Sequence, residues 1–503
     1  MAGIEKGLPH MTLADERLKE LDNPSLTEKE RVLLRCRVAA DFIHTGRYEA
    51  AREALGDLWR GIGDRPKVAG LDEQATAEVL LQVGVLSGWL GVSRQVTGAQ
   101  EAAKDLISES AALFEGIGEA KRAANARADL SICYWREGAF EEARAVLESA
   151  AALIEENTEL KAKTILCFAI VESSAGRYGD TFRLLTDSAP LFGEGLSHRL
   201  RGIFHNELAI VLRRLGTAEH RTDYLDRAII EYTAAIYHYE QAGHERYKAT
   251  NQNNLAFLLH KLGRYREAHE QLDRAGATLF RLKDAGLLAQ VDETRASVFI
   301  AEKKYREADR VIARAIETLE KGGESALLAE ALTTQGVVRA RLGASDESMN
   351  ILRRAMRVAE DAGALSNAGL AALALIEEHG ARRVMLHGEL YSLYRRADEL
   401  LKGSQDAEDK ERLLGCARIV MRRIIVGELH DKNFSLFSAV HDLEARLIEQ
   451  ALEESGGSIT KAARLLGVNH QTLGSMLRTR HKGLLKKRTP AEKRLRSIIK
   501  KDA

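Results

Sequence analysis

A pattern of small and aromatic residues recurs about every 40 residues over much of this chain. A glycine marks most copies of the pattern, and a lysine takes its place once. The marks are Gly46, Gly91, Gly138, Gly176, Gly216, Gly263, Lys303 and Gly343. A period of this length indicates one helical hairpin per repeat, and a hairpin can bury its apolar face only against neighbouring hairpins. The chain is therefore predicted to be all-α and to form a stacked array.

A small residue lies seven positions before each mark. These residues are Ala39, Gly84, Ser131, Ala169, Ala209, Ala256, Ala296 and Gly336. Small side chains let two antiparallel helices approach closely, and an aromatic residue that often follows the mark fills the space beside them. The glycine itself is predicted to close the turn between the helices. The array is predicted to begin at a capping box, Thr27 to Glu30.

The segment LAFLLHKLGRYREAHEQLDRA, Leu255 to Ala275, carries all of these features. It resembles the tetratricopeptide repeat (TPR) in its longer form of about 40 residues. The resemblance implies an α-solenoid of about eight or nine hairpins over residues 27–402, with a degenerate ninth copy around Gly369 to Leu401. Another kind of helical solenoid is the alternative.

A TPR solenoid offers a groove lined by the first helix of each pair, and the resemblance places several side chains there. Asn206 and Asn253 hold equivalent positions in successive repeats, where their amides could bind the backbone of an extended peptide. The predicted groove residues are Trp135, Asn206, Arg213, Thr250, Asn253 and His260. The resemblance implies a protein or peptide ligand, and a merely solvated polar face is the alternative.

A second pattern, Gly456 to Arg480, predicts two short helices with a tight turn between them. Gly456 and Gly457 end the preceding helix and Gly467 permits the turn, since glycine tolerates left-handed backbone geometry. Thr460 is expected to cap the first helix, with Val468 packed beneath the turn. Asn469 is expected to cap the second helix, His470 to about Thr479, with Leu473 and Leu477 facing inward. This arrangement is typical of a helix-turn-helix.

The surrounding sequence LEARLIEQALEESGGSITKAARLLGVNHQTLGSML, Leu443 to Leu477, is similar to the Fis-type DNA-binding domain of bacterial regulators. That family usually has Arg in place of His470 and a basic residue in place of Met476. The resemblance implies binding to double-stranded DNA and a homodimer formed partly by the helix before the turn. The predicted dimer residues are Leu443, Leu447, Ile448 and Leu452; packing of this helix only on its own domain is the alternative.

The candidate DNA contacts lie on the leading faces of the two helices and in the basic run that follows. Side chains at the start of the second helix can reach base edges, whereas hydroxyls and cations hold phosphates. The predicted contacts are Ser458, Thr460, Asn469, His470, Gln471, Thr472, Ser475, Arg478, Arg480, Lys482, Lys486, Lys487 and Arg488. Residues 443–503 carry about 14 Lys or Arg against about 6 Asp or Glu, although the whole chain has no net charge. Such asymmetry favours a nucleic-acid-binding end.

The remaining segments complete the predicted organisation. Residues 1–26 form a leader, 403–442 a linker and connecting helix, 443–480 the helix-turn-helix, and 481–503 a basic tail with a short amphipathic helix after Thr489. A solubilising tail is the alternative to a DNA clamp. The start resembles no signal peptide, and no run of about 18 apolar residues indicates a membrane span. A cytoplasmic location without a membrane follows.

No catalytic pattern with specificity is present. The sequence contains no GxxxxGK[ST] loop, HExxH, GxSxG or CxxC motif, and Cys36, Cys133, Cys167 and Cys416 are far apart. We therefore expect no catalytic residues, no metal, no cofactor and no enzymatic activity, and we expect the cysteines to be core residues. The sequence predicts a bacterial transcriptional regulator; a TPR scaffold whose terminal domain serves assembly or protein binding is the alternative.

Overall fold

The structure is a computed structural model that describes residues 25–94, 96, 98–154, 158–322, 324–381, 385–404, 406–426 and 435–487. Every regular element in these ranges is helical. The chain divides into two compact units, Met1–Ala417 and Arg418–Ala503. The expectations for residues 1–24, for Arg488 and for the terminal amphipathic helix lie outside the described residues.

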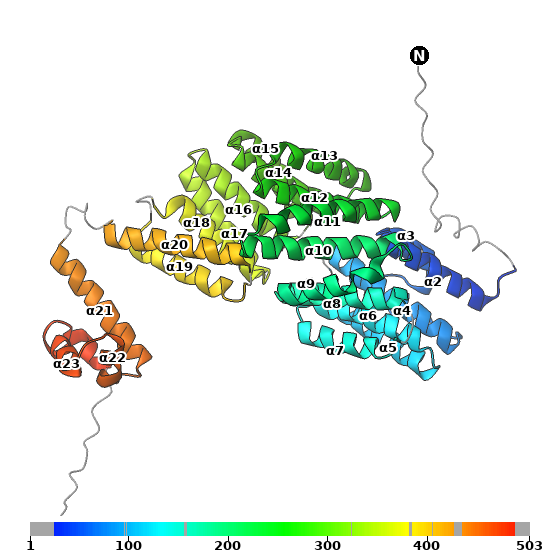
Figure 1. Ribbon diagram of the computed structural model, residues 1–503, viewed down its shortest axis with the longest axis horizontal. Helices are drawn as coiled ribbons and strands as arrows, with labels where there is room; N and C mark the ends of the chain where they lie inside the picture. The colour runs from blue at the N-terminus through cyan, green and yellow to red at the C-terminus, as the bar shows by residue number, and fades with distance from the viewer. Residues whose placement is uncertain are drawn as a thin grey trace, which may run out of the picture. The chain divides into compact units, whose positions relative to one another are not determined.

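Nine helical hairpins follow one another in the described part of the first unit (Figure 1). The degenerate ninth repeat is present as α18 and α19. The hairpins are α2 (Glu28–His44) with α3 (Tyr48–Leu55), α4 (Glu73–Arg94) with α5 (Ala99–Gly116), α6 (Ala120–Arg136) with α7 (Phe140–Ala151), α8 (Thr158–Ser174) with α9 (Tyr178–Ser188), α10 (His198–Ala218) with α11 (Thr222–Gln241), α12 (Glu245–Lys261) with α13 (Tyr265–Leu282), α14 (Ala285–Ala301) with α15 (Tyr305–Gly322), α16 (Ser325–Arg341) with α17 (Ser345–Asp361), and α18 (Leu365–His379) with α19 (His387–Leu401). Short 3-10 turns, η1 (Gly56–Leu58) and η2 (Ala189–Phe192), follow α3 and α9, and α20 (Ala407–Val426) follows the last hairpin.

The small residues before each mark lie where paired helices touch. Ala39 and Ala256 have no exposed surface. A Cβ added to Gly84 would lie 2.6 Å from Ile107 Cγ1, and one added to Gly336 would lie 2.5 Å from Leu352 Cγ. These distances are shorter than any normal carbon contact, so the predicted close approach of the helices is confirmed.

The marks close the hairpin turn in six of the eight repeats. Gly46, Gly138, Gly176, Gly263 and Gly343 have φ angles of 75°, 76°, 79°, 74° and 89°, and Lys303 adopts 62°. The prediction is wrong at Gly91 and Gly216, because α4 continues to Arg94 and α10 to Ala218. At Gly216 a Cβ would lie 2.8 Å from Leu225 Cδ2. Glycine at these two positions makes room for the next helix instead of turning the chain.

The helix α12 contacts parts of the first unit that are distant in sequence. Near its start, the ring of Tyr247 lies 6.3 Å from that of Trp89, which stacks on Tyr48 at 5.5 Å. At its other end, Lys261 Nζ lies 2.5 Å from Glu408 Oε1, 147 residues further along the chain. The stacked repeats therefore wind far enough to bring both the first repeats and α20 against the same helix.

One described helix, within Glu73–Val92, is long and apolar enough to cross a membrane by length and composition, but 78% of its most apolar window is buried. Its apolar residues belong to the repeat core; Val79, Leu80 and Leu86 have no exposed surface. Burial among neighbouring helices accounts for the composition of this helix without a membrane.

The four cysteines are free and buried, as predicted. Burial raises the pKa of the Cys36 and Cys416 thiols to about 12 and of the Cys133 and Cys167 thiols to about 11. Because thiolates are the reactive form of cysteine, these residues are inert packing groups at neutral pH.

The described part of the second unit contains α21 (Leu436–Glu454), α22 (Ile459–Leu465), α23 (His470–Thr479) and a 3-10 segment, η4 (Lys482–Lys487). Gly456, Gly457 and Gly467 have φ angles of 61°, 81° and 64°, as expected of the two turns. The helices enclose a small apolar core. Its buried members are Ile448, Ala451, Leu452, Ala462, Ala463, Leu473 and Leu477.

Candidate nucleic-acid interface and repeat groove

Local interactions position α23. The Asn469 side chain caps the helix, since its Oδ1 accepts a hydrogen bond of 2.7 Å from the backbone N–H of Thr472. Leu473 and Leu477 have no exposed surface and anchor the opposite face of the helix. The remaining candidate contacts on α23 are exposed. They are His470, Gln471, Thr472, Ser475 and Arg478.

The start of α22 differs from the expectation. Ser458 holds the N-cap position and Thr460 lies exposed within the first turn, because the helix begins at Ile459. The Ser458 hydroxyl makes no capping hydrogen bond. Val468 is 37% exposed and does not pack beneath the turn. Met476 packs against the domain core, so this departure from the family pattern turns an apolar side chain inward where a cation is usual.

The structure separates the predicted cations into two groups. Lys487 Nζ lies 2.5 Å from Glu449 Oε1 and 2.6 Å from Glu453 Oε1, and Arg480 pairs with Glu444 at 3.2 Å. By contrast, three exposed cations have no ion pair within the described residues, namely Arg478, Lys482 and Lys486. Exposed, unpaired cations are the ones available to a phosphate backbone.

A histidine pair that sequence reasoning missed fastens the end of α23 to α21. His481 is buried, and its Nε2 lies 3.2 Å from Glu444 Oε2. Its ring centroid is 4.5 Å from that of His441, and His441 Nε2 lies 2.9 Å from the carbonyl oxygen of Arg480. These contacts join residues nearly 40 positions apart, so no local spacing could have revealed them.

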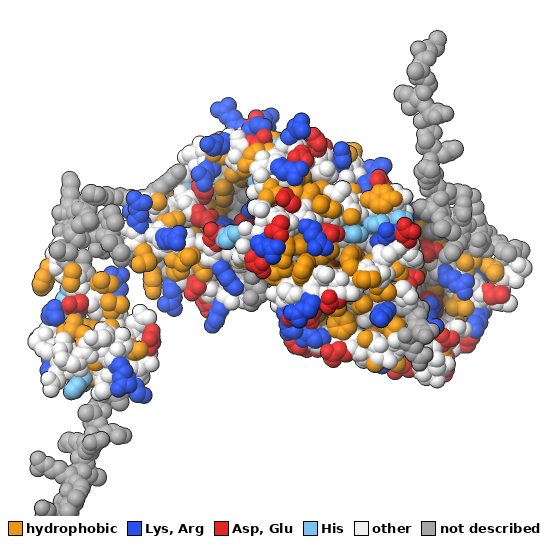
Figure 2. Space-filling model, in the orientation of Figure 1, with side chains coloured by type: hydrophobic (Ala, Val, Ile, Leu, Met, Phe, Trp, Pro, Cys, Tyr) orange, Lys and Arg blue, Asp and Glu red, His pale blue; other side chains and the backbone are white. Residues whose placement is uncertain are grey.

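The predicted dimer residues lie on two different faces of α21. Ile448 is 2% exposed and Leu452 is fully buried in the domain core, so assigning them to a dimer seam was wrong. Leu443 and Leu447 are 50% and 48% exposed. Two further apolar residues of the same helix, Phe437 and Val440, are 81% and 47% exposed, and apolar side chains are visible along α21 (Figure 2). We call Phe437, Val440, Leu443 and Leu447 the α21 apolar stripe.

A family model described as bacterial regulatory protein, Fis family, matches residues 439–478. These residues form a Fis-type helix-turn-helix. The match includes most of α21 and all of α22, the turn and nearly all of α23. A Fis-type domain indicates DNA binding.

Several solved structures are similar to the solenoid. A Rap protein in complex with competence and sporulation factor has a TM-score of 0.45 at 16% identity, over 73% of this chain and 100% of that chain. A signal-transduction ATPase with a tetratricopeptide-repeat sensor from Pyrococcus horikoshii has a TM-score of 0.49 at 11% identity, over 80% of this chain and 55% of that one. Yeast Tom70 has a TM-score of 0.38 at 13% identity, over 82% and 85%. No curated protein sequence matches the chain.

Arg213, Asn253 and His260 lie around Phe257, and the other three predicted groove residues make hydrogen bonds within the solenoid. Trp135 Nε1 donates to Ser174 Oγ at 2.7 Å, Asn206 Nδ2 donates to Glu207 Oε1 at 2.9 Å, and Thr250 Oγ1 donates to the carbonyl of Arg246 at 3.1 Å. These three side chains already have partners inside the solenoid. The partner-binding role predicted for all six stays a prediction.

Asn253 lines a cavity of about 270 Å³ between α12, α14, α15 and α16. The cavity also holds Phe257 and two glutamates that sequence reasoning missed, Glu293 and Glu330. Glu293 Oε1 accepts a hydrogen bond of 2.7 Å from Thr334 Oγ1, and burial raises the pKa of its carboxyl. Glu330 lines the same cavity, where desolvation by burial and the charge of Glu293 raise the pKa of its carboxyl. Glu293 follows Asn253 by one repeat length, a signal that could have identified it.

Arg213 and His260 lie near the first turn of α20. Arg213 Cζ and Lys261 Nζ lie 5.5 and 5.4 Å from the ring centroid of Phe257. Burial and the charge of Lys261 lower the pKa of His260, whereas Glu408 acts in the opposite direction. This part of the solenoid is therefore rich in cations and in contact with α20.

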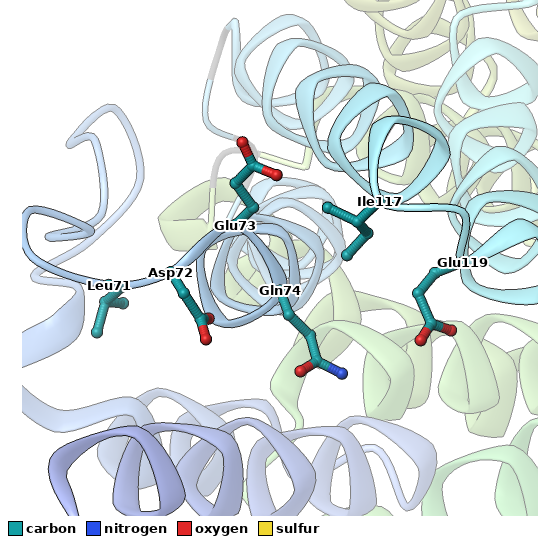
Figure 3. Close-up of a pocket in the computed structure, with 6 residues that line it drawn as sticks. All are labelled: Leu71, Asp72, Glu73, Gln74, Ile117 and Glu119. Atoms are coloured by element: carbon teal, nitrogen blue, oxygen red, sulfur yellow. The ribbon is translucent and has the colours of Figure 1, made fainter.

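A larger hollow of about 600 Å³ lies beside the start of α4 (Figure 3). Its acidic residues point in different directions, with Glu73 turned away from Asp72 (Figure 3). Asp72 is committed to structure: it accepts hydrogen bonds from the backbone N–H of Ala75 at 2.8 Å and from Lys29 Nζ at 2.5 Å. Asp72 therefore caps the start of α4, and we assign no ligand to this hollow.

Proposed function

We propose that the chain is a bacterial, cytoplasmic transcriptional regulator that acts without catalysis. In this proposal the Fis-type domain binds double-stranded DNA as a homodimer, and the solenoid binds a protein or peptide partner. The observation that carries it is α23, which is capped by Asn469, backed by buried leucines and lined outside by polar and basic side chains. A scaffold is the second candidate, favoured by the pairing of Arg480 and Lys487 inside their own domain.

Gln471 is expected to read bases. The preferred site comes from sequencing DNA that co-purifies with the full chain. On that site, Gln471→Ala should weaken binding about tenfold, because a lost base contact costs about 1–3 kcal/mol, while affinity for random duplex should hardly change. Fluorescence anisotropy on both duplexes measures this. Gln450→Ala, an exposed glutamine on α21, is the matched control. Equal losses on both duplexes would rule out base reading by Gln471.

The α21 apolar stripe is the proposed dimer seam. Replacing Leu443 and Leu447 together by Asp should give monomers, because the association would bury two charges against apolar side chains. Light scattering gives the mass, and binding to duplex DNA should weaken in parallel. Leu465→Asp, at a leucine of α22 that is 59% exposed, controls for added charge. Retention of a dimeric mass by the double variant would place the contact elsewhere in the chain.

A further inference from the structure

The first turn of α20 is attached to the middle of the solenoid. Asp406, just before α20, pairs with Arg214 of α10, 192 residues away in the sequence. Glu408 pairs with Lys261, the last residue of α12, at 2.5 Å. The segment that follows the last hairpin therefore lies on the C-terminal turns of two helices from the fifth and sixth hairpins.

The surface beneath this segment is basic. We call Arg213, Arg214 and Lys261 the basic surface. Arg213 and Lys261 flank the ring of Phe257, and Arg213 has no ion pair within the described residues. Cations also suit helix C-termini, which carry partial negative charge. That effect explains one cation per helix end, but it does not explain why Arg214 and Lys261 both pair with carboxylates from a distant segment.

The segment is held by charge and not by apolar packing. Lys402 and Gly403 are exposed, and Asp406 and Glu408 are half-buried. In α20 the first fully buried side chain is Cys416, whose Sγ lies 3.7 Å from the carbonyl oxygen of Leu373. The side chains of the Lys261–Glu408 pair are 41% and 40% exposed, so this pair contributes little to stability. The Arg214–Asp406 pair is more buried, at 30% and 26%. Because no side chain before Cys416 in α20 is fully buried, the attachment of the first turn depends mainly on these two ion pairs.

We propose that the basic surface is a docking site for an extended acidic segment of a partner protein, and that Asp406 and Glu408 occupy it in the unbound chain. The proposal rests on the partner-binding role proposed for the solenoid and specifies the charge of the partner. In the sequence, this turn precedes the rest of α20, which ends at Val426, and the Fis-type domain.

The test uses a fluorescent peptide with the sequence of residues 402–412, KGSQDAEDKER, added to the full chain. Anisotropy should show that the Asp406→Asn, Glu408→Gln variant binds the peptide at least about tenfold more tightly than the wild type, since a tethered competitor acts at high effective concentration. Glu399→Gln, which removes an exposed carboxylate of α19, should leave the affinity unchanged. A peptide with Asn in place of Asp406 and Gln in place of Glu408 should bind much more weakly.

Further replacements locate the site. Adding Lys261→Ala to the Asp406→Asn, Glu408→Gln variant should reduce peptide affinity several-fold. Lys261 is partly exposed, and circular dichroism verifies the fold of each variant. Equal peptide affinity of wild type and variant, or equal binding of the peptide with Asn and Gln at positions 406 and 408, would overturn the proposal. Binding to random duplex is measured in parallel. If the chain binds DNA but not the peptide, only the proposed docking site is refuted. If it binds the peptide but not DNA, only the proposed role as a DNA-binding regulator is refuted.

Discussion

Replacing Ala256 by Leu is expected to destabilise the solenoid by about 1–3 kcal/mol or more, because additional methylenes overpack a close helix contact. Ala256 has no exposed surface and lies in α12. This helix contacts the first repeats through Tyr247 and the first turn of α20 through Lys261. Displacing α12 should therefore disturb contacts at both ends of the array as well as its own hairpin.

Thermal and urea unfolding followed by circular dichroism measure the effect. Ala277→Leu is the matched control. Ala277 is exposed on the neighbouring helix α13, so this substitution adds the same volume without overpacking a helix contact. The control should melt with the wild type, and Ala256→Leu should melt several degrees lower. Coincident curves for all three proteins would contradict the tight contact assigned to Ala256.

Replacing Arg478, Lys482 and Lys486 together by Ala is expected to weaken DNA binding about a hundredfold at roughly 150 mM salt. The three side chains are exposed and have no ion pair in the described part of the chain. Each phosphate contact changes the slope of log affinity against log salt by about 0.9, so three lost contacts should flatten it by about 2.7. Random and preferred duplexes should lose affinity nearly alike, because phosphate contacts carry no sequence information.

Lys487→Ala provides the matched control, since Lys487 is engaged by Glu449 and Glu453. Its removal should change the salt slope much less than one exposed cation would. Titrations at several salt concentrations measure all slopes. An unchanged slope for the triple variant would show that these cations are not the phosphate contacts and would favour the scaffold.

The repeat pattern predicted most of the solenoid because its signals are local. The capping box at Thr27 and Glu30 forms as expected, with the Thr27 N–H donating to Glu30 Oε2 at 2.9 Å. The turn prediction failed at Gly91 and Gly216, where the same residue type serves a close helix approach instead. A glycine therefore marks a special backbone environment, but which one depends on the helix that packs against it.

For the candidate site, the sequence by itself determined the helix-turn-helix, because the Asn469 cap, the glycine turns and the one-turn spacing of Leu473 and Leu477 act within a few residues. Tertiary structure decided which face of α21 is buried, which leaves Leu447 outside and Ile448 inside. It also decided that Lys487 is paired whereas Lys486 is not.

The contacts of α12 with Trp89 and Glu408 are likewise decided only by tertiary structure. They depend on the small rotation between successive hairpins, summed over several repeats. No local pattern encodes that sum. The hairpins could therefore be predicted from the sequence, whereas the meeting of distant segments on α12 could be found only in the folded chain.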